Sequence, residues 1–82
     1  MSGGLPAISG VKLMKLLEAD GWQFLRESTH GKAYTKVING TPRVATIPNK
    51  RKSLPQGTLL GILGSKQTGL GRKWLKESLG KS

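Results

Sequence analysis

The sequence predicts a single small α+β domain in which a helix, three antiparallel strands and a second helix are followed by a short C-terminal helix. Three observations support this. The 82 residues leave room for about one domain. Apolar residues recur at helical spacing near both ends, and an Asn-Gly pair between two strand-like stretches signals a hairpin. We therefore expect residues 1–82 to form one domain whose two main helices cover one face of the sheet, with residues 1–8 flexible.

The first helix is expected over residues 10–20. Ser9 is a suitable N-cap, and Gly21 can adopt the left-handed conformation that ends a helix. Apolar and charged side chains separate onto two faces, which predicts a surface helix buried on one side. The apolar face holds Leu13, Met14, Leu16 and Leu17, and the opposite face holds Lys12, Lys15 and Glu18.

Three strands are expected over residues 22–28, 32–38 and 41–47, with Asn39 and Gly40 as a two-residue turn between the last two. The turn fixes the register. The expected pairs are Ile38 with Thr41, Lys36 with Arg43, Tyr34 with Ala45, and Lys32 with Ile47. Like charges directly opposite each other destabilise a ladder unless both are solvated or an anion covers them. Tyr34 is interpreted either as a core residue or as a ring for base stacking.

The second helix is expected to start near Leu54, because residues 53–56 fit a capping box. Its apolar stripe is Leu59, Ile62 and Leu63, and the opposite side carries Gly57, Gly61 and Gly64. Those glycines indicate either a short, frayed helix or close approach of a backbone or a phosphate. The last helix is expected over residues 71–79, with Trp74, Leu75 and Leu79 inward and Arg72, Lys73 and Lys76 outward.

Charge is distributed unevenly along the chain. Residues 1–27 hold three basic and three acidic residues, whereas the remainder holds eleven bases and only Glu77, giving a net charge of +10. This asymmetry favours nucleic acid, or an acidic protein partner, over a merely solubilising surface. The chain lacks cysteine and has one histidine, so we expect no metal and no cofactor. No signal-peptide pattern and no apolar run of membrane-spanning length occur, which predicts a cytoplasmic protein without a membrane partner.

His30 lies in a Ser-Thr-His-Gly turn between the first two strands, flanked by Arg26 and Lys32. Positive surroundings favour the neutral imidazole, which can accept a proton from a ribose 2′-hydroxyl while Lys or Arg stabilises charge on the phosphoryl oxygens. The alternative is an ordinary surface histidine.

The order helix, three strands, helix is also that of double-stranded RNA-binding domains, although architecture alone does not decide function. Three stretches, LPAISGVKLMKLLEADGWQFLRESTHG, TIPNKRKSLPQGTLLGIL and KQTGLGRKWL, resemble the HicA toxins of bacterial and archaeal toxin–antitoxin modules, from about Leu5 to Leu79. The family's landmarks read here as Gly21-Trp22, Arg26, Ser28-Thr29-His30, Ile47-Pro48 and the stretch 54–59. Their order and spacing together make the resemblance specific.

This resemblance implies a double-stranded-RNA-binding-domain-like αβββα sandwich, mRNA endonuclease activity and inhibition by an acidic HicB-type antitoxin. His30 takes the place of the family's catalytic histidine. Ser28 and Thr29 replace the usual glycine and serine, and Asn49-Lys50 stands where many members have a second histidine. The second proton-transfer role is therefore open to Lys32, Tyr34, Lys50 or water.

The expected function is that of the toxin of a type II toxin–antitoxin module, a metal-independent mRNA endonuclease with His30 as general acid or base. One alternative is a non-catalytic RNA-binding module of the same fold. Another is an interaction protein whose basic face serves only an acidic partner. The expected RNA-binding residues are Arg26, Lys32, Lys36, Arg43, Lys50, Arg51 and Lys52.

Overall fold

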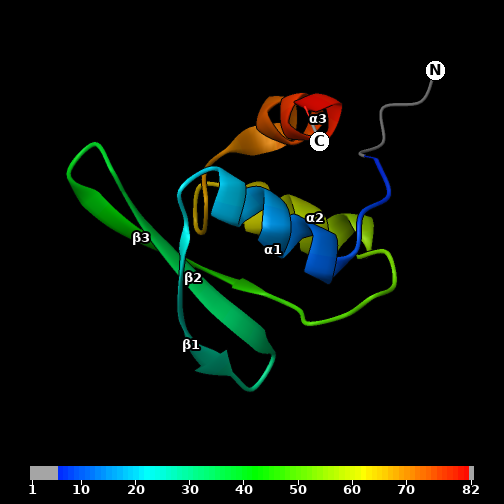
Figure 1. Cartoon of the computed structure of the whole chain (residues 1–82), viewed down its shortest axis with the longest axis horizontal. Coiled ribbons are helices and arrows are strands. Elements are labelled where there is room, and N and C mark those ends of the chain that lie inside the picture. The colour runs from blue at the N-terminus through cyan, green and yellow to red at the C-terminus, as the bar shows by residue number, and fades with distance from the viewer. Residues whose placement is uncertain (1–5, 82) are drawn as a thin grey trace.

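The computed structural model describes residues 6–81 and has the predicted α+β architecture (Figure 1). Its elements are α1 (Gly10–Ala19), β1 (Gln23–Ser28), β2 (Gly31–Ile38), β3 (Thr41–Ile47), α2 (Gln56–Leu63) and α3 (Gly71–Lys81). The strands form one antiparallel sheet in the order β1-β2-β3. This arrangement agrees with that of double-stranded RNA-binding domains, with α3 added.

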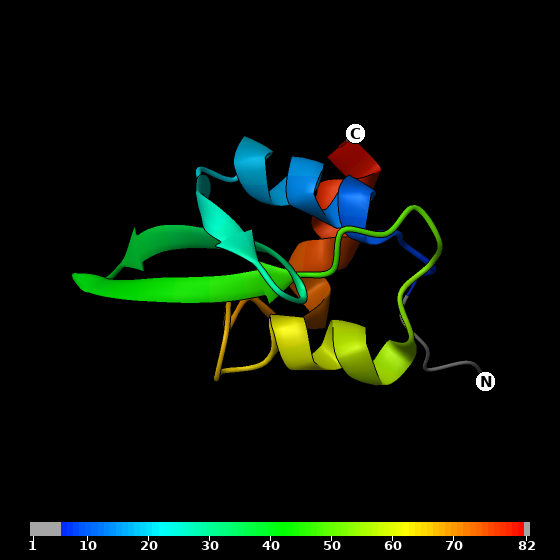
Figure 2. The same cartoon turned by 90° about the horizontal axis from the view of Figure 1, so that it is seen from below.

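One face of the sheet packs on the helices. Tyr34, Ala45 and Ile47 share this face and belong to the same buried cluster as Leu17 of α1 and Leu59 of α2. The hairpin of β2 and β3 projects beyond the helices (Figure 2). Within residues 6–81, no helix is long and apolar enough to cross a membrane.

The N-terminal segment is tied to the fold from Ile8 onward. Residues 1–5, which fall within the stretch expected to be flexible, lie outside the described residues. Ile8 is buried, and its carbonyl oxygen accepts a hydrogen bond from the Leu54 amide at 2.8 Å. The chain is thus held in place just before α1 begins.

Helix α1 forms as its sequence predicts. The Ser9 hydroxyl accepts a hydrogen bond from the Lys12 amide at 3.1 Å, and Gly21 has a φ of 102° after the last turn. The predicted apolar face is buried and the charged face is exposed. Trp22 differs from expectation because it precedes β1, with its side chain buried in the core.

The predicted hairpin register of β2 and β3 is confirmed. All four expected pairs occur, and Asn39 and Gly40 have φ values of 53° and 77°. Positive φ at both central residues matches the twist of a two-residue hairpin.

The predicted capping box before α2 is wrong. The helix begins at Gln56 after Pro55, which makes no side-chain capping hydrogen bond, and Ser53 instead forms an isolated β-bridge with Ser9. Proline disfavours helical backbone in the residue before it, and Leu54 lies outside the helix with its side chain buried in the core.

The glycine side of α2 faces open space. A Cβ atom added at Gly57 or Gly61 would meet nothing within 4 Å. The helix is short, with eight residues, and within residues 6–81 no backbone approaches Gly57 or Gly61.

Helix α3 packs against the hydrophobic core. Leu75 is buried, and Trp74 and Leu79 pack partly buried against the core cluster, as predicted. The three basic residues expected to point outward, Arg72, Lys73 and Lys76, are exposed.

Candidate active site

The turn between β1 and β2 presents His30. Ser28 pairs with Gly31, which leaves Thr29 and His30 at the tip. The His30 amide donates to the Ser28 hydroxyl oxygen at 3.4 Å, so the serine side chain supports the turn. The histidine backbone is therefore held while its exposed side chain is free to rotate on a fast timescale.

Gly31 brings this turn against the end of β3. Its φ is 148°, and a Cβ there would overlap the Ile47 carbonyl oxygen and lie 2.9 Å from the Pro48 Cα. Only glycine accommodates both the backbone conformation and this contact. The glycine after the histidine thus places the Ile47-Pro48 strand end directly beside the turn.

The loop after β3 is anchored to the start of α1. The Val11 amide donates to the Lys50 carbonyl oxygen at 3.1 Å, and the Lys50 amide donates to the Pro48 carbonyl oxygen at 2.9 Å. Gly10 allows the contact, since a Cβ at that position would overlap the Pro48 oxygen. Lys50 is thereby held next to the His30 turn.

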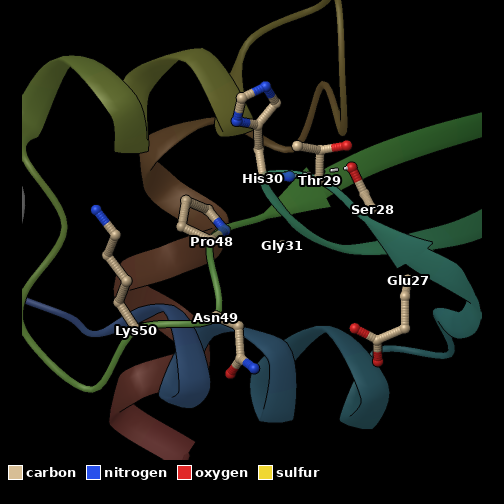
Figure 3. Close-up of a pocket in the computed structure, with 8 residues that line it drawn as sticks. All are labelled: Glu27, Ser28, Thr29, His30, Gly31, Pro48, Asn49 and Lys50. Carbon is tan, nitrogen blue, oxygen red and sulfur yellow. Dashed lines mark hydrogen bonds between the residues drawn. The ribbon is translucent and has the colours of Figure 1, made fainter.

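A hollow of about 540 Å³ lies between the turn and this loop. Its lining residues are Glu27, Ser28, Thr29, His30, Gly31, Pro48, Asn49 and Lys50. In Figure 3 the imidazole of His30 points away from the side chains of Glu27 and Asn49, which extend toward α1. The imidazole is exposed and can change rotamer, and hydrogen bonds at a catalytic site often form only when substrate is bound.

Glu27 and Asn49 are pocket residues that sequence reasoning did not select. A β-bulge places Glu27 at the pocket. The pairing of β1 with β2 shifts between Phe24 and Arg26, and this shift puts Glu27 opposite Lys32. Without the extra residue, the side chains of β1 beyond the bulge would change faces. No short-range sequence signal marks this bulge.

Four of the predicted RNA-binding residues lie in or near the pocket. Lys50 lines it, and Arg51 and Lys52 follow as exposed loop residues. Lys32 immediately follows Gly31, and its Nζ lies 6.0 Å from the centroid of the Phe24 ring. Arg26 pairs with Ala33, so it faces away from the side of the sheet that carries Tyr34 and Lys32.

Lys36 and Arg43 are not brought to the pocket. They are paired as expected, but Lys36 Nζ donates to the Asp20 carbonyl oxygen at 2.6 Å and forms an ion pair with its carboxylate at 3.1 Å. Arg43 donates to the carbonyl oxygens of Ser65 and Gln67 at 2.7 and 3.2 Å. Lys36 and Arg43 are thus each held by hydrogen bonds to different protein oxygen atoms. Their pairing across the ladder does not depend on solvent or on an anion that covers both.

Tyr34 is a core residue, so the alternative of base stacking does not apply to it. Its ring is buried, and its hydroxyl donates to Glu18 Oε2 at 2.8 Å. Burial, followed by the hydrogen bond to Glu18, raises the pKa of the Tyr34 hydroxyl to about 12. Tyr34 is not among the residues that line the pocket described above, and its hydroxyl is already bonded to Glu18, so it is poorly placed for the second proton-transfer role.

The Tyr34 hydroxyl should stabilise the fold, so Tyr34→Phe should lower the free energy of unfolding by about 1 kcal/mol at pH 7. The folded pKa of about 12 exceeds the ordinary value of 10.0, so this contribution is present below pH 10 and is lost as pH rises toward 12. Urea unfolding at pH 8, 10 and 11 should therefore show a steeper loss of stability for the wild type. If the free energy of unfolding fell equally with pH in the wild type and in Tyr34→Phe, that result would count against the assigned hydrogen bond.

Comparison with known proteins decides the family. The family model described as the HicA toxin of bacterial toxin–antitoxin matches residues 10–70, which include the His30 turn and the Lys50 loop. The chain belongs to the HicA toxin family. No curated protein and no solved structure matches it. Membership makes this HicA protein the toxin of a toxin–antitoxin module and implies an antitoxin partner.

Proposed function

We propose that this HicA toxin is an mRNA endonuclease that cleaves RNA without a metal ion, with His30 as its general acid or base. The observation that carries the proposal is the pocket that places His30 and Lys50 together on a strongly basic chain. The volume of the pocket is in the range usual for small-ligand sites, and the positive charge of Lys50 suits a phosphodiester.

His30 removes the proton of a ribose 2′-hydroxyl, and the resulting oxygen attacks the adjacent phosphorus. The bond from phosphorus to the 5′ oxygen breaks, and that oxygen takes up a proton as it leaves. The products are a 2′,3′-cyclic phosphate and a 5′-hydroxyl. Positive charge beside the phosphate stabilises the charge that develops on its oxygens.

Lys50 is the best placed of the groups considered for the second role. It lines the pocket with His30, whereas Tyr34 is buried on the helix-facing side. Lys50 either stabilises the phosphoryl oxygens or delivers the proton to the leaving oxygen, with water as the other proton source. Within the described residues, no three His, Cys, Asp or Glu side chains cluster as a metal site would require.

Asn49 favours one competing function, that of an RNA-binding module without chemistry. Many HicA proteins carry a second histidine near this position, and here the pocket contains an amide instead. Such a module would bind RNA through the same basic surface and leave it intact.

The antitoxin is proposed to be an acidic protein of the HicB type that covers the His30 pocket. Opposite charge would make its association fast, and RNA would compete for the same surface.

Incubation of the purified toxin with an mRNA in excess EDTA tests the proposal. We expect cleavage to continue at an unchanged rate, because acid–base chemistry by His30 and Lys50 requires no metal. Activity lost on chelation and restored by magnesium would reject the mechanism. RNA that is bound but never cut would favour the non-catalytic module.

A further inference from the structure

Phe24 in β1 has an exposed aromatic ring that lies outside the hydrophobic core. The chain has four aromatic residues, all within the described range. Trp22 and Tyr34 are buried and Trp74 is partly buried against the core, whereas Phe24 is 51% exposed. An exposed ring on a basic RNA-facing chain is a feature of surfaces that stack nucleobases.

The Phe24 ring is held in a defined orientation. It meets Tyr34 edge to face, with the centroids 6.0 Å apart and the planes at 76°. Tyr34 is itself fixed by its hydrogen bond to Glu18. The contact with buried Tyr34 favours one orientation of the Phe24 ring, which lowers the conformational freedom that the ring loses when a base stacks on it.

A cation lies over one face of this ring and leaves the other face for a base. Lys32 Nζ is 6.0 Å from the ring centroid, and no ion pair holds Lys32 within the part of the chain that the structure describes. The ammonium can therefore contact the phosphate of a nucleotide whose base lies on Phe24. Phe24 can thus contact the base of a nucleotide, and Lys32 can contact its phosphate.

The ring also lies close to the candidate active site. Phe24 pairs with Tyr34 and Glu27 pairs with Lys32, so the ring and the pocket edge are separated by two residues of β2. That separation is roughly 7 Å at the usual rise of a strand. A single strand that crosses this edge of the pocket can thus bring a nearby base to Phe24.

We infer that Phe24 is a stacking platform for a nucleobase of single-stranded RNA, near the phosphodiester whose cleavage His30 is proposed to catalyse. This inference rests on the proposed function and adds a subsite to it. A protein partner is the less favoured occupant, because within residues 6–81 only Leu25 among the other exposed large apolar residues adjoins Phe24 in β1. Val37 and Val44 lie on the opposite face of the sheet, and Leu60 lies in α2. Stacking depends on the face of the base, so the subsite should accept all four bases.

The test uses the His30→Ala protein, which keeps RNA intact, and fluorescence anisotropy of a labelled single-stranded RNA. Adding Phe24→Ala should weaken binding about ten-fold, and Phe24→Leu should weaken it similarly because it keeps apolar contact but not the ring. Phe24→Trp should bind at least as tightly as the parent. Val37→Ala, at a site 65% exposed on the other face, is the matched control and should change nothing.

A ribose-phosphate strand of equal length without bases supplies the second readout. The parent should prefer RNA to the abasic strand, and Phe24→Ala should lose that preference while keeping the same salt dependence, since no phosphate contact is removed. Unchanged RNA affinity in Phe24→Ala, or full affinity in Phe24→Leu, overturns the stacking site and leaves the proposed function standing. Failure of every variant, the parent included, to bind RNA overturns the proposed function and this inference together.

Discussion

Replacing His30 with alanine should lower the rate of RNA cleavage by on the order of 10² to 10⁴, as expected when a general acid or base is lost. The melting temperature should hardly change, because the side chain is exposed and only its backbone amide bonds to Ser28. Single-turnover cleavage of a labelled RNA and a thermal melt measure both effects on one preparation.

Thr29→Ala is the control for His30→Ala, since Thr29 occupies the same turn tip and is also exposed. It should retain most of the activity. A purified His30→Ala protein that cleaves RNA as fast as the wild type would remove the catalytic role of the histidine.

Gly31→Ala should destabilise the protein severely. The new Cβ would overlap the Ile47 carbonyl oxygen and lie 2.7 Å from the Ile47 carbonyl carbon, at a φ of 148° that L-residues rarely adopt. Overpacking and backbone strain together should cost about 3 kcal/mol or more. For a domain of this size, that lowers the melting temperature on the order of 15 °C.

Gly57→Ala is the matched control for Gly31→Ala. Its Cβ would point into open space on an exposed helix face, so the change should stabilise α2 by roughly 0.5 to 1 kcal/mol. Thermal and urea unfolding of the two variants should therefore move in opposite directions from the wild type. A Gly31→Ala protein as stable as the wild type would mean that the turn does not rest on the strand end as described.

Features set by local chemistry were predictable from the sequence. The Asn39-Gly40 turn determined the register of β2 and β3, because a two-residue hairpin permits only one pairing. The periodicity of α1 identified its buried face, and the turn containing His30 formed where the sequence placed it.

Features set by distant contacts were not predictable. Lys36 and Arg43 bind acceptors in Asp20 and in the loop after α2, which no pattern within the strands reveals. The bulge in β1 likewise turned Arg26 to the opposite face and placed Glu27 at the pocket. The capping box failed for a local reason, since the effect of Pro55 on Leu54 outweighed the capping pattern.

The chemical ends of the RNA fragments test the central claim most directly. Mass spectrometry of an RNA cleaved in EDTA should find 2′,3′-cyclic phosphates and 5′-hydroxyls, because attack by the 2′ oxygen produces both. Fragments with 5′-phosphates and 3′-hydroxyls would contradict the account, since they require attack by water rather than by the 2′ oxygen that His30 is proposed to activate.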